Sequence, residues 1–214
     1  MSGLAGLAEL LVLSDSRLPT GGHVHSGGVE EAVTSGLVTD LDGLRAFLVR
    51  RIRTSGLVSA SVAAAVHAGV LSLADADAET DARTPAPAAR AASRAQGRGL
   101  ARLARRVWPA ADWSALGTRP HLAVAAGAVG AAGTLTPEQT ALSLVYTTMT
   151  GSATAAQRLL ALDPGDVAAL TFALVPLCEQ TAAAAAKELA DLSDPLLDVL
   201  AQRHAGRDRP LFVS

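Results

Sequence analysis

The sequence contains very little cysteine, lysine or aromatic side chain. Cys178 is the only cysteine among the 214 residues, so no disulfide can form within the chain. Lys187 is the only lysine, and the positive charge is therefore almost entirely arginine. Aromatic residues make up 3% of the chain although 50% of it is apolar, so alanine, leucine and valine supply the apolar content. Because alanine and leucine are strong helix formers, this composition favours a closely packed, all-helical protein.

The chain also lacks an excess of positive charge and a long, strongly apolar run. Lys and Arg together number 18 and Asp and Glu number 20, which gives a net charge of −2 at pH 7. Nucleic-acid-binding proteins usually carry a basic excess, so this balance argues against that class. A membrane-spanning helix needs about 20 apolar residues, and the best candidate segments, 57–74 and 122–135, are rich in Ala, Gly and Ser. Since the N-terminus also lacks a signal-peptide pattern, we expect a cytoplasmic protein that binds neither nucleic acid nor membranes.

Signals for helix starts recur along the chain. Asp40 can cap a helix through its side chain. Thr136, Asp163 and Asp194 are each followed by proline, the residue favoured at the first helical position. Apolar residues at helical spacing follow these signals, and no segment shows the alternation typical of a strand. The sequence therefore predicts an all-α fold.

The expected organisation is one compact domain, 1–214, of about eight to ten helices. Residues 1–28 would form an N-terminal helix and a glycine-rich loop, and 206–214 a C-terminal tail without helical pattern. The expected helices cover 4–13, 29–35, 41–71 with a break at Gly56, 72–83, 87–107, 121–132, a segment that starts at 137, 164–191 and 195–205.

The glycine-rich loop carries His23 and His25, one residue apart, and Glu30 and Glu31 follow closely. Imidazole and carboxylate groups suit nickel or zinc, so His23 and His25 are candidate metal ligands. A strong site would need three or four convergent ligands. The alternative interpretation is a glycine-rich turn in which Ser26 caps the helix that follows.

Five arginines recur at four-residue steps in the expected helix 87–107: Arg90, Arg94, Arg98, Arg102 and Arg106. Four-residue steps keep these side chains near one face of a helix. Like charges at this spacing destabilise a helix by about 0.2–0.5 kcal/mol per pair, so something should offset them. The acidic segment from Asp75 to Asp81 is one candidate, and an acidic partner surface is the other.

Signatures of catalysis are missing from the sequence. The Gly-x-Ser-x-Gly nucleophile pattern does not occur, and the glycine-rich loop lacks the Gly-Lys-Ser/Thr ending of a phosphate-binding loop. Cys178 has no histidine nearby in the sequence. We therefore expect a protein that is not an enzyme and that holds no cofactor.

Several short elements occur in order along nearly the whole chain. They are a leucine-rich segment ending in Leu-Pro-Thr-Gly at 10–21, Ser-Gly-Gly-Val-Glu at 26–30, Ser-Arg-Ala-Gln-Gly at 93–97, His-Leu-Ala-Val-Ala-Ala-Gly at 121–127, Ala-Gln-Arg-Leu at 156–159, Arg-His at 203–204 and Arg-Pro-Leu-Phe-Val-Ser at 209–214. Together they resemble the UreF family of urease accessory proteins. Ala205 departs from the pattern, because the family usually has glutamate after Arg-His.

The resemblance implies an all-helical homodimer that acts as a chaperone for urease. UreF-like proteins bridge a UreD- or UreH-type accessory protein to the GTPase UreG, and the complex helps to install two nickel ions in apo-urease. By this resemblance the chain has no catalytic residues of its own. An arginine supplied to the partner GTPase would be a further way to act.

The resemblance also indicates residues that would bind partners. Arg158 lies in a matched segment within an otherwise apolar helix, although a solvated surface arginine would look the same. In the tail we expect Arg209, Leu211, Phe212 and Ser214 to contact the UreD-type partner, with the leucine and phenylalanine as apolar anchors.

Two other functions remain open at this point. One is an independent nickel-binding protein that uses His23 and His25. The other is a helical oligomeric scaffold unrelated to urease.

Overall fold

The structure is a computed structural model that describes residues 5–192 and 194–213. Within these residues the chain forms ten α-helices and no β-strand, as predicted. The helices are α1 (Leu7–Leu13), α2 (Val29–Thr34), α3 (Leu41–Arg51), α4 (Leu57–His67), α5 (Leu73–Ala82), α6 (Pro87–Val107), α7 (Leu122–Ala132), α8 (Pro137–Leu160), α9 (Pro164–Ala185) and α10 (Pro195–Ala205). Short 3₁₀ turns lie at Gly22–Val24 and Ser114–Leu116.

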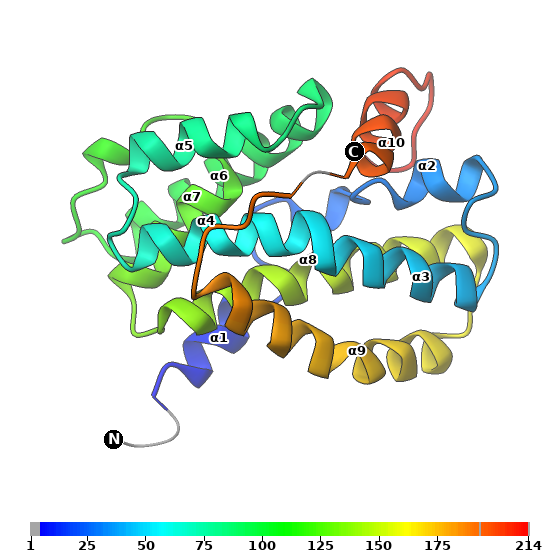
Figure 1. The fold of residues 1–214 in the computed structure, drawn as a ribbon, viewed down its shortest axis with the longest axis horizontal. Helices are drawn as coiled ribbons and strands as arrows, with labels where there is room; N and C mark the ends of the chain where they lie inside the picture. The colour runs from blue at the N-terminus through cyan, green and yellow to red at the C-terminus, as the bar shows by residue number, and fades with distance from the viewer. Residues whose placement is uncertain (1–4, 193, 214) are drawn as a thin grey trace.

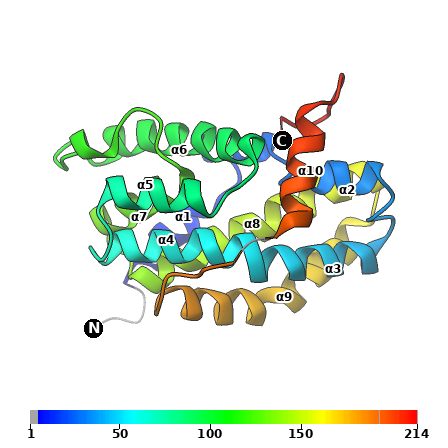
Figure 2. The ribbon, with the colours of Figure 1, turned by 45° about the horizontal axis from the view of Figure 1, so that its top comes forward.

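Two long helical rows form the centre of the molecule. α3 and α4 run end to end across it, and α8 packs against both of them (Figure 1). α9 covers α8 on one side, while α7 and α5 pack against α4 on the other and α6 packs on α7. α10 lies across the top of the molecule, where it bridges α2 and α6 (Figure 2). This arrangement brings the C-terminal tail close to the N-terminal loop.

Side-chain caps fix where the helices begin. The Asp40 carboxylate accepts the backbone N–H of Gly43 at the start of α3. Thr136 and Gln139 form a reciprocal capping box at the start of α8. Asp163 and Asp194 accept backbone N–H groups at the starts of α9 and α10, and each precedes a proline. These four helix starts confirm the sequence prediction.

The predicted break at Gly56 is a change of helix type rather than an interruption. Ile52–Gly56 form a π-helical segment, so α3 continues into α4 along one axis. A π-segment holds one extra residue per turn, which rotates the side chains that follow it, and such segments are frequent at functional sites. Two predicted ends were wrong: α4 ends at His67 rather than at 71, and α9 ends at Ala185 rather than at 191.

The core is divided among three groups of apolar side chains. The largest lies between α2, α3, α8, α9 and α10, and the smaller two surround α7. α9 is, by length and composition alone, apolar enough to cross a membrane, and 33% of its apolar window is buried. One side of α9 packs in the largest group through Val167, Leu170 and Leu174. A helix that packs in a protein core can meet the same criterion of length and apolar composition.

Candidate functional site

The C-terminal tail is docked on the body of the protein by one buried glutamate. The backbone N–H groups of Leu211 and Phe212 donate to the two carboxylate oxygens of Glu30, at 2.6 and 3.0 Å. His204 Nε2 lies 2.8 Å from the same carboxylate. One residue further on, the N–H of Val213 donates to the carbonyl of Val24 in the glycine-rich loop, at 2.7 Å. The tail and the loop therefore form one continuous surface.

Two of the residues expected to bind partners are exposed at this surface. Leu211 is 67% exposed, and Arg209 is exposed as well. Phe212 is only 7% exposed and packs in the largest core group, so in this structure it anchors the tail to its own chain. Ser214 lies outside the described residues. Arg158 is exposed near the end of α8, on a different element.

The two candidate metal-binding histidines are not joined by the glutamates that follow them. His23 is exposed, whereas His25 is half-buried and lines a cavity, where burial lowers its pKa. Glu30 holds the tail, and Glu31 pairs with Arg207 at 2.6 Å. The carboxylates that would complete a nickel site are therefore engaged elsewhere.

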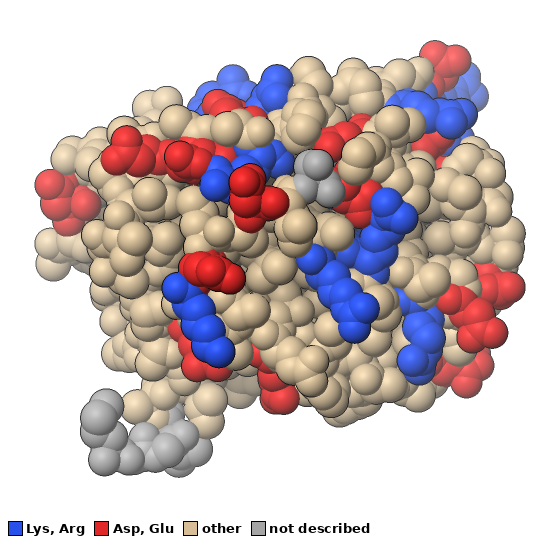
Figure 3. All heavy atoms as spheres, viewed as in Figure 1, with Lys and Arg blue, Asp and Glu red and all other residues tan. Residues whose placement is uncertain are grey.

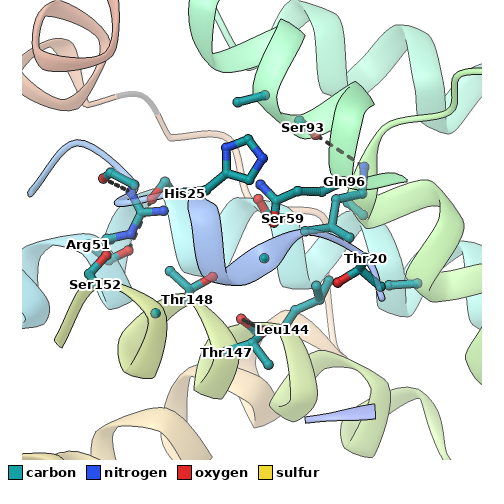
Figure 4. Close-up of a pocket in the computed structure, with 18 of the residues that line it drawn as sticks. Thr20, His25, Arg51, Ser59, Ser93, Gln96, Leu144, Thr147, Thr148 and Ser152 are labelled. Carbon is teal, nitrogen blue, oxygen red and sulfur yellow. Dashed lines mark hydrogen bonds between the residues drawn. The ribbon is translucent and has the colours of Figure 1, made fainter. Parts of the chain in front are cut away.

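A cavity of about 630 Å³ lies between the glycine-rich loop, α6, the α3–α4 row and α8. Figure 4 shows Arg51, Ser59, Thr148 and Ser152 facing into it, with His25 between them and α6. Hydroxyl groups dominate the polar part of its wall. The cavity thus offers hydrogen-bond donors and acceptors, with Arg51 as a cation among them.

The described part of the chain contains one group of three potential metal ligands, formed by Asp77, Asp81 and His121. Their donor atoms lie within 4.8 Å of one another. Arg94 already occupies the position of a cation there, because its Nη2 lies 2.8 Å from an oxygen of each aspartate. The hydrogen bonds and charges of His121 and Arg94 hold the pKa of Asp81 below its ordinary value, against the opposing effect of burial. This group is a polar link between α5, α6 and α7.

The arginine ladder is therefore divided between two environments. Arg90 pairs with Asp81 and Arg94 with Asp77, both in α5. This agrees with the first of the two predicted alternatives, in which the acidic segment from Asp75 to Asp81 offsets the arginines. Arg98, Arg102 and Arg106 are exposed and form no ion pair with any residue of the described ranges. Figure 3 shows the acidic side chains of α5 beside basic ones at the top of the molecule.

Comparison with known proteins identifies the family. The UreF family model matches residues 38–175, which extend from the residues before α3 into α9. The chain is 79% identical over 214 residues to a urease accessory protein UreF of Mycolicibacterium vanbaalenii, with 99% of this chain and 100% of the relative covered. The corresponding protein of Mycobacterium marinum is 74% identical over 208 residues, covering 97% and 99% of the two chains.

A third relative, the urease accessory protein UreF of Mycobacterium tuberculosis, is 69% identical over 211 residues and covers 99% and 100% of the two chains. The chain belongs to the UreF family. The docked tail and the glycine-rich loop lie outside residues 38–175, yet they fall within the similarity to these UreF relatives, which spans nearly the whole chain.

Sequence reasoning missed two residues that the structure places at this site. Glu30 was considered only as a candidate metal ligand, although the match at 26–30 to the UreF pattern included it. Arg51 stood out in no pattern, because its position depends on the contact between Gly27 and the last turn of α3.

Proposed function

We propose that this chain is a urease accessory protein that takes part in nickel insertion into apo-urease and has no catalytic site of its own. The observation that carries the proposal is its similarity, over nearly the full length of both chains, to proteins named urease accessory protein UreF. A cytoplasmic location, where apo-urease would be assembled, belongs to the same proposal.

The partners in this proposal are a UreD- or UreH-type accessory protein and the GTPase UreG. The surface formed by the tail and the glycine-rich loop is the candidate contact with the UreD-type protein. It exposes Leu211 and Val213, at 67% and 66%, beside the charged Arg209. Apolar side chains surrounded by charged ones are typical of a protein–protein contact. A second copy of the chain completes the proposed complex as a homodimer.

The exposed arginines of α6 are the candidate contact with the GTPase. Arg98, Arg102 and Arg106 have no acidic partner within the described ranges, and arginine suits bidentate contact with carboxylates and phosphates. The test is the rate of GTP hydrolysis by the partner GTPase, measured with and without this chain. A change in that rate that is lost when these arginines are substituted would support an effect on the partner's activity.

Coexpression tests the main proposal. A urease operon is expressed in nickel-replete cells with and without this chain, and urea hydrolysis and the nickel content of purified urease are measured. We expect both to depend on the chain. Urease that acquires nickel and activity equally well without it, from cells in which the other accessory proteins are confirmed soluble, would contradict the proposal.

The tail contact needs a separate test. A chain truncated after Arg207 removes the exposed Leu211 and Val213 together with the anchor Phe212. We expect it to lose copurification with the UreD-type partner. A Leu211→Ser variant keeps the Glu30 hydrogen bonds, because these involve only backbone N–H groups, and so separates loss of contact from loss of tail docking.

A further inference from the structure

Arg51 carries a positive charge without a carboxylate partner in the part of the chain that the structure describes. It is the last residue of α3, directly before the π-segment. Its one hydrogen bond runs from Nη1 to the carbonyl oxygen of Gly27, at 2.5 Å. Its Nε is buried and has no hydrogen-bond partner. The buried carboxylates Glu30 and Asp194 each pair with another basic side chain.

The position of the guanidinium is fixed by the loop above it. A Cβ added to Gly27 would lie 2.5 Å from Nη2 and 2.6 Å from Cζ of Arg51, and Gly27 has φ +65°. Glycine therefore lets the loop lie directly against the guanidinium. Burial lowers the pKa of Arg51 to about 10, so the side chain remains protonated at neutral pH. A desolvated charge without a counter-ion is unfavourable in a folded protein.

The cavity beside Arg51 supplies further donors. Thr148 of α8 and Ser59 of α4 line the same cavity, and their hydroxyl groups make no hydrogen bond with any described residue. Figure 4 shows Thr148 on the side of the cavity below Arg51 and Ser59 across it. Ser152 is already engaged, since its hydroxyl donates to the carbonyl of Ser26 at 3.0 Å. Unused N–H and O–H groups therefore lie in the wall of one cavity that is otherwise mostly apolar.

We propose that this cavity binds a small oxyanion of the phosphate or sulfate type at Arg51. A guanidinium presents several N–H groups in a planar fork that matches the spacing of two oxygens on one anion. The free hydroxyl of Thr148, on the side of the cavity below Arg51, can donate to a remaining oxygen. An oxyanion would supply the missing counter-ion at the Nη1 and Nη2 groups, whereas Nε has almost no accessible surface and stays behind them.

Calorimetry on the full-length protein tests the site. Phosphate and sulfate are titrated at constant ionic strength in a chloride buffer, so that chloride is the competing anion throughout. We expect one saturable site in the wild type and a loss of about tenfold or more in affinity in Arg51→Gln, since hydrogen bonds to charged groups are among the stronger ones. Arg53→Gln removes the same charge from an exposed position two residues away and should leave the affinity within about twofold, the range expected of a surface charge.

Three results would overturn the proposal. The first is that the wild-type protein binds neither anion saturably. The second is that Arg51→Gln binds the anions as tightly as the wild type does. The third is an equal loss of affinity in Arg51→Gln and Arg53→Gln, which would indicate only general charge attraction. If Arg51→Gln does not fold, crystals of the wild type soaked in selenate decide the matter. A selenium peak that puts a selenate oxygen within hydrogen-bond distance of the guanidinium supports the site, and a peak elsewhere, an adventitious ion only, refutes it.

Discussion

At the scale of single residues, the close approach of α6 to the start of α7 depends on Gly97. A Cβ at this position would lie 2.7 Å from the carbonyl carbon and 2.8 Å from the carbonyl oxygen of His121, both backbone atoms that cannot turn away. We predict that Gly97→Ala lowers the free energy of unfolding by about 1–3 kcal/mol, the usual cost of overpacking. Urea unfolding followed by circular dichroism measures it.

The control for this prediction is another helical glycine. A Cβ at Gly151 in α8 would meet nothing within 4 Å, so Gly151→Ala should stabilise the protein by up to about 1 kcal/mol through helix propensity. Equal effects of the two substitutions would show that packing against His121 does not decide the outcome.

The charge state of Glu30 connects the docked tail to pH. Burial by itself raises the pKa of Glu30, but the hydrogen bonds from His204 and from the backbone of Leu211 and Phe212 outweigh it and hold the pKa below its ordinary value of 4.5. A carboxylate whose pKa is lower in the folded state stabilises the fold above its unfolded pKa and loses that contribution as the pH falls through its folded pKa. The tail anchor is therefore complete at neutral pH and weakens in acid below pH 4.5.

Removing this charge should loosen the tail at neutral pH. We predict that Glu30→Gln lowers the free energy of unfolding by about 1–3 kcal/mol, because a charge-assisted acceptor of buried N–H groups is lost. Hydrogen exchange at the amides of Leu211 and Phe212 should also become faster. Glu188→Gln, at an exposed position, is the control. Unchanged exchange in the Glu30 variant would show that Phe212 burial and the Val213–Val24 hydrogen bond hold the tail without the Glu30 charge.

The role of Glu30 could not have been predicted from the sequence. Its histidine partner is 174 residues away along the chain, and its amide partners are 181 and 182 residues away. No local pattern encodes such a contact. The nearby His23 and His25 instead suggested a metal site, because a sequence pattern relates only residues that are close together in the chain.

At the scale of helices, local signals predicted most of the fold because caps act within one turn. The range 87–107 predicted for α6 agrees with the structure, and Asp40, Thr136, Asp163 and Asp194 each mark the start of a helix. The sequence predicted a break at Gly56 but not its π-helical form, and the segment contacts α8 and α9, which are distant in sequence. The end of α9 was predicted at 191, whereas the helix ends at Ala185. The alanines at 182–186 continue across this end, and alanine has high helix propensity, so residue type gives no signal for it.

The link between α5 and α6 is an ion-pair prediction at this scale. Arg94 bridges Asp77 and Asp81 and is half-buried, with 22% of its side chain exposed. We predict that Arg94→Gln lowers the free energy of unfolding by about 1–3 kcal/mol, because the carboxylates of Asp77 and Asp81 lose the cation that they share. Arg98→Gln, one turn further along α6 and exposed, should change it by less than about 0.5 kcal/mol. Thermal unfolding at low and high salt measures both, and an equal effect of the two variants would contradict the link.

At the scale of the whole molecule, the outer side of α9 is the surface that best suits a second copy of the chain. Phe172 is 78% exposed, and its exposed neighbours on this side, from Ala168 to Pro176, carry no charge. The middle of α9 correspondingly shows uncharged side chains in Figure 3. A large aromatic ring left in water at the centre of an uncharged helix surface is unfavourable, and burying it would contribute about 25 cal/mol per Å² of apolar area.

A charge placed on this side of α9 should therefore separate the proposed dimer. We predict that the wild type sediments as a dimer at micromolar concentration and that Phe172→Glu sediments as a monomer with the same helical circular dichroism, because an unpaired carboxylate would have to be buried between two copies. Val70→Glu makes the same kind of change at another exposed position, 76% exposed in the turn after α4, and should leave the dimer intact. A Phe172→Glu protein that remains dimeric would move the interface to another surface, such as that formed by the tail and the glycine-rich loop. The contact with the UreD-type partner would then compete with self-association.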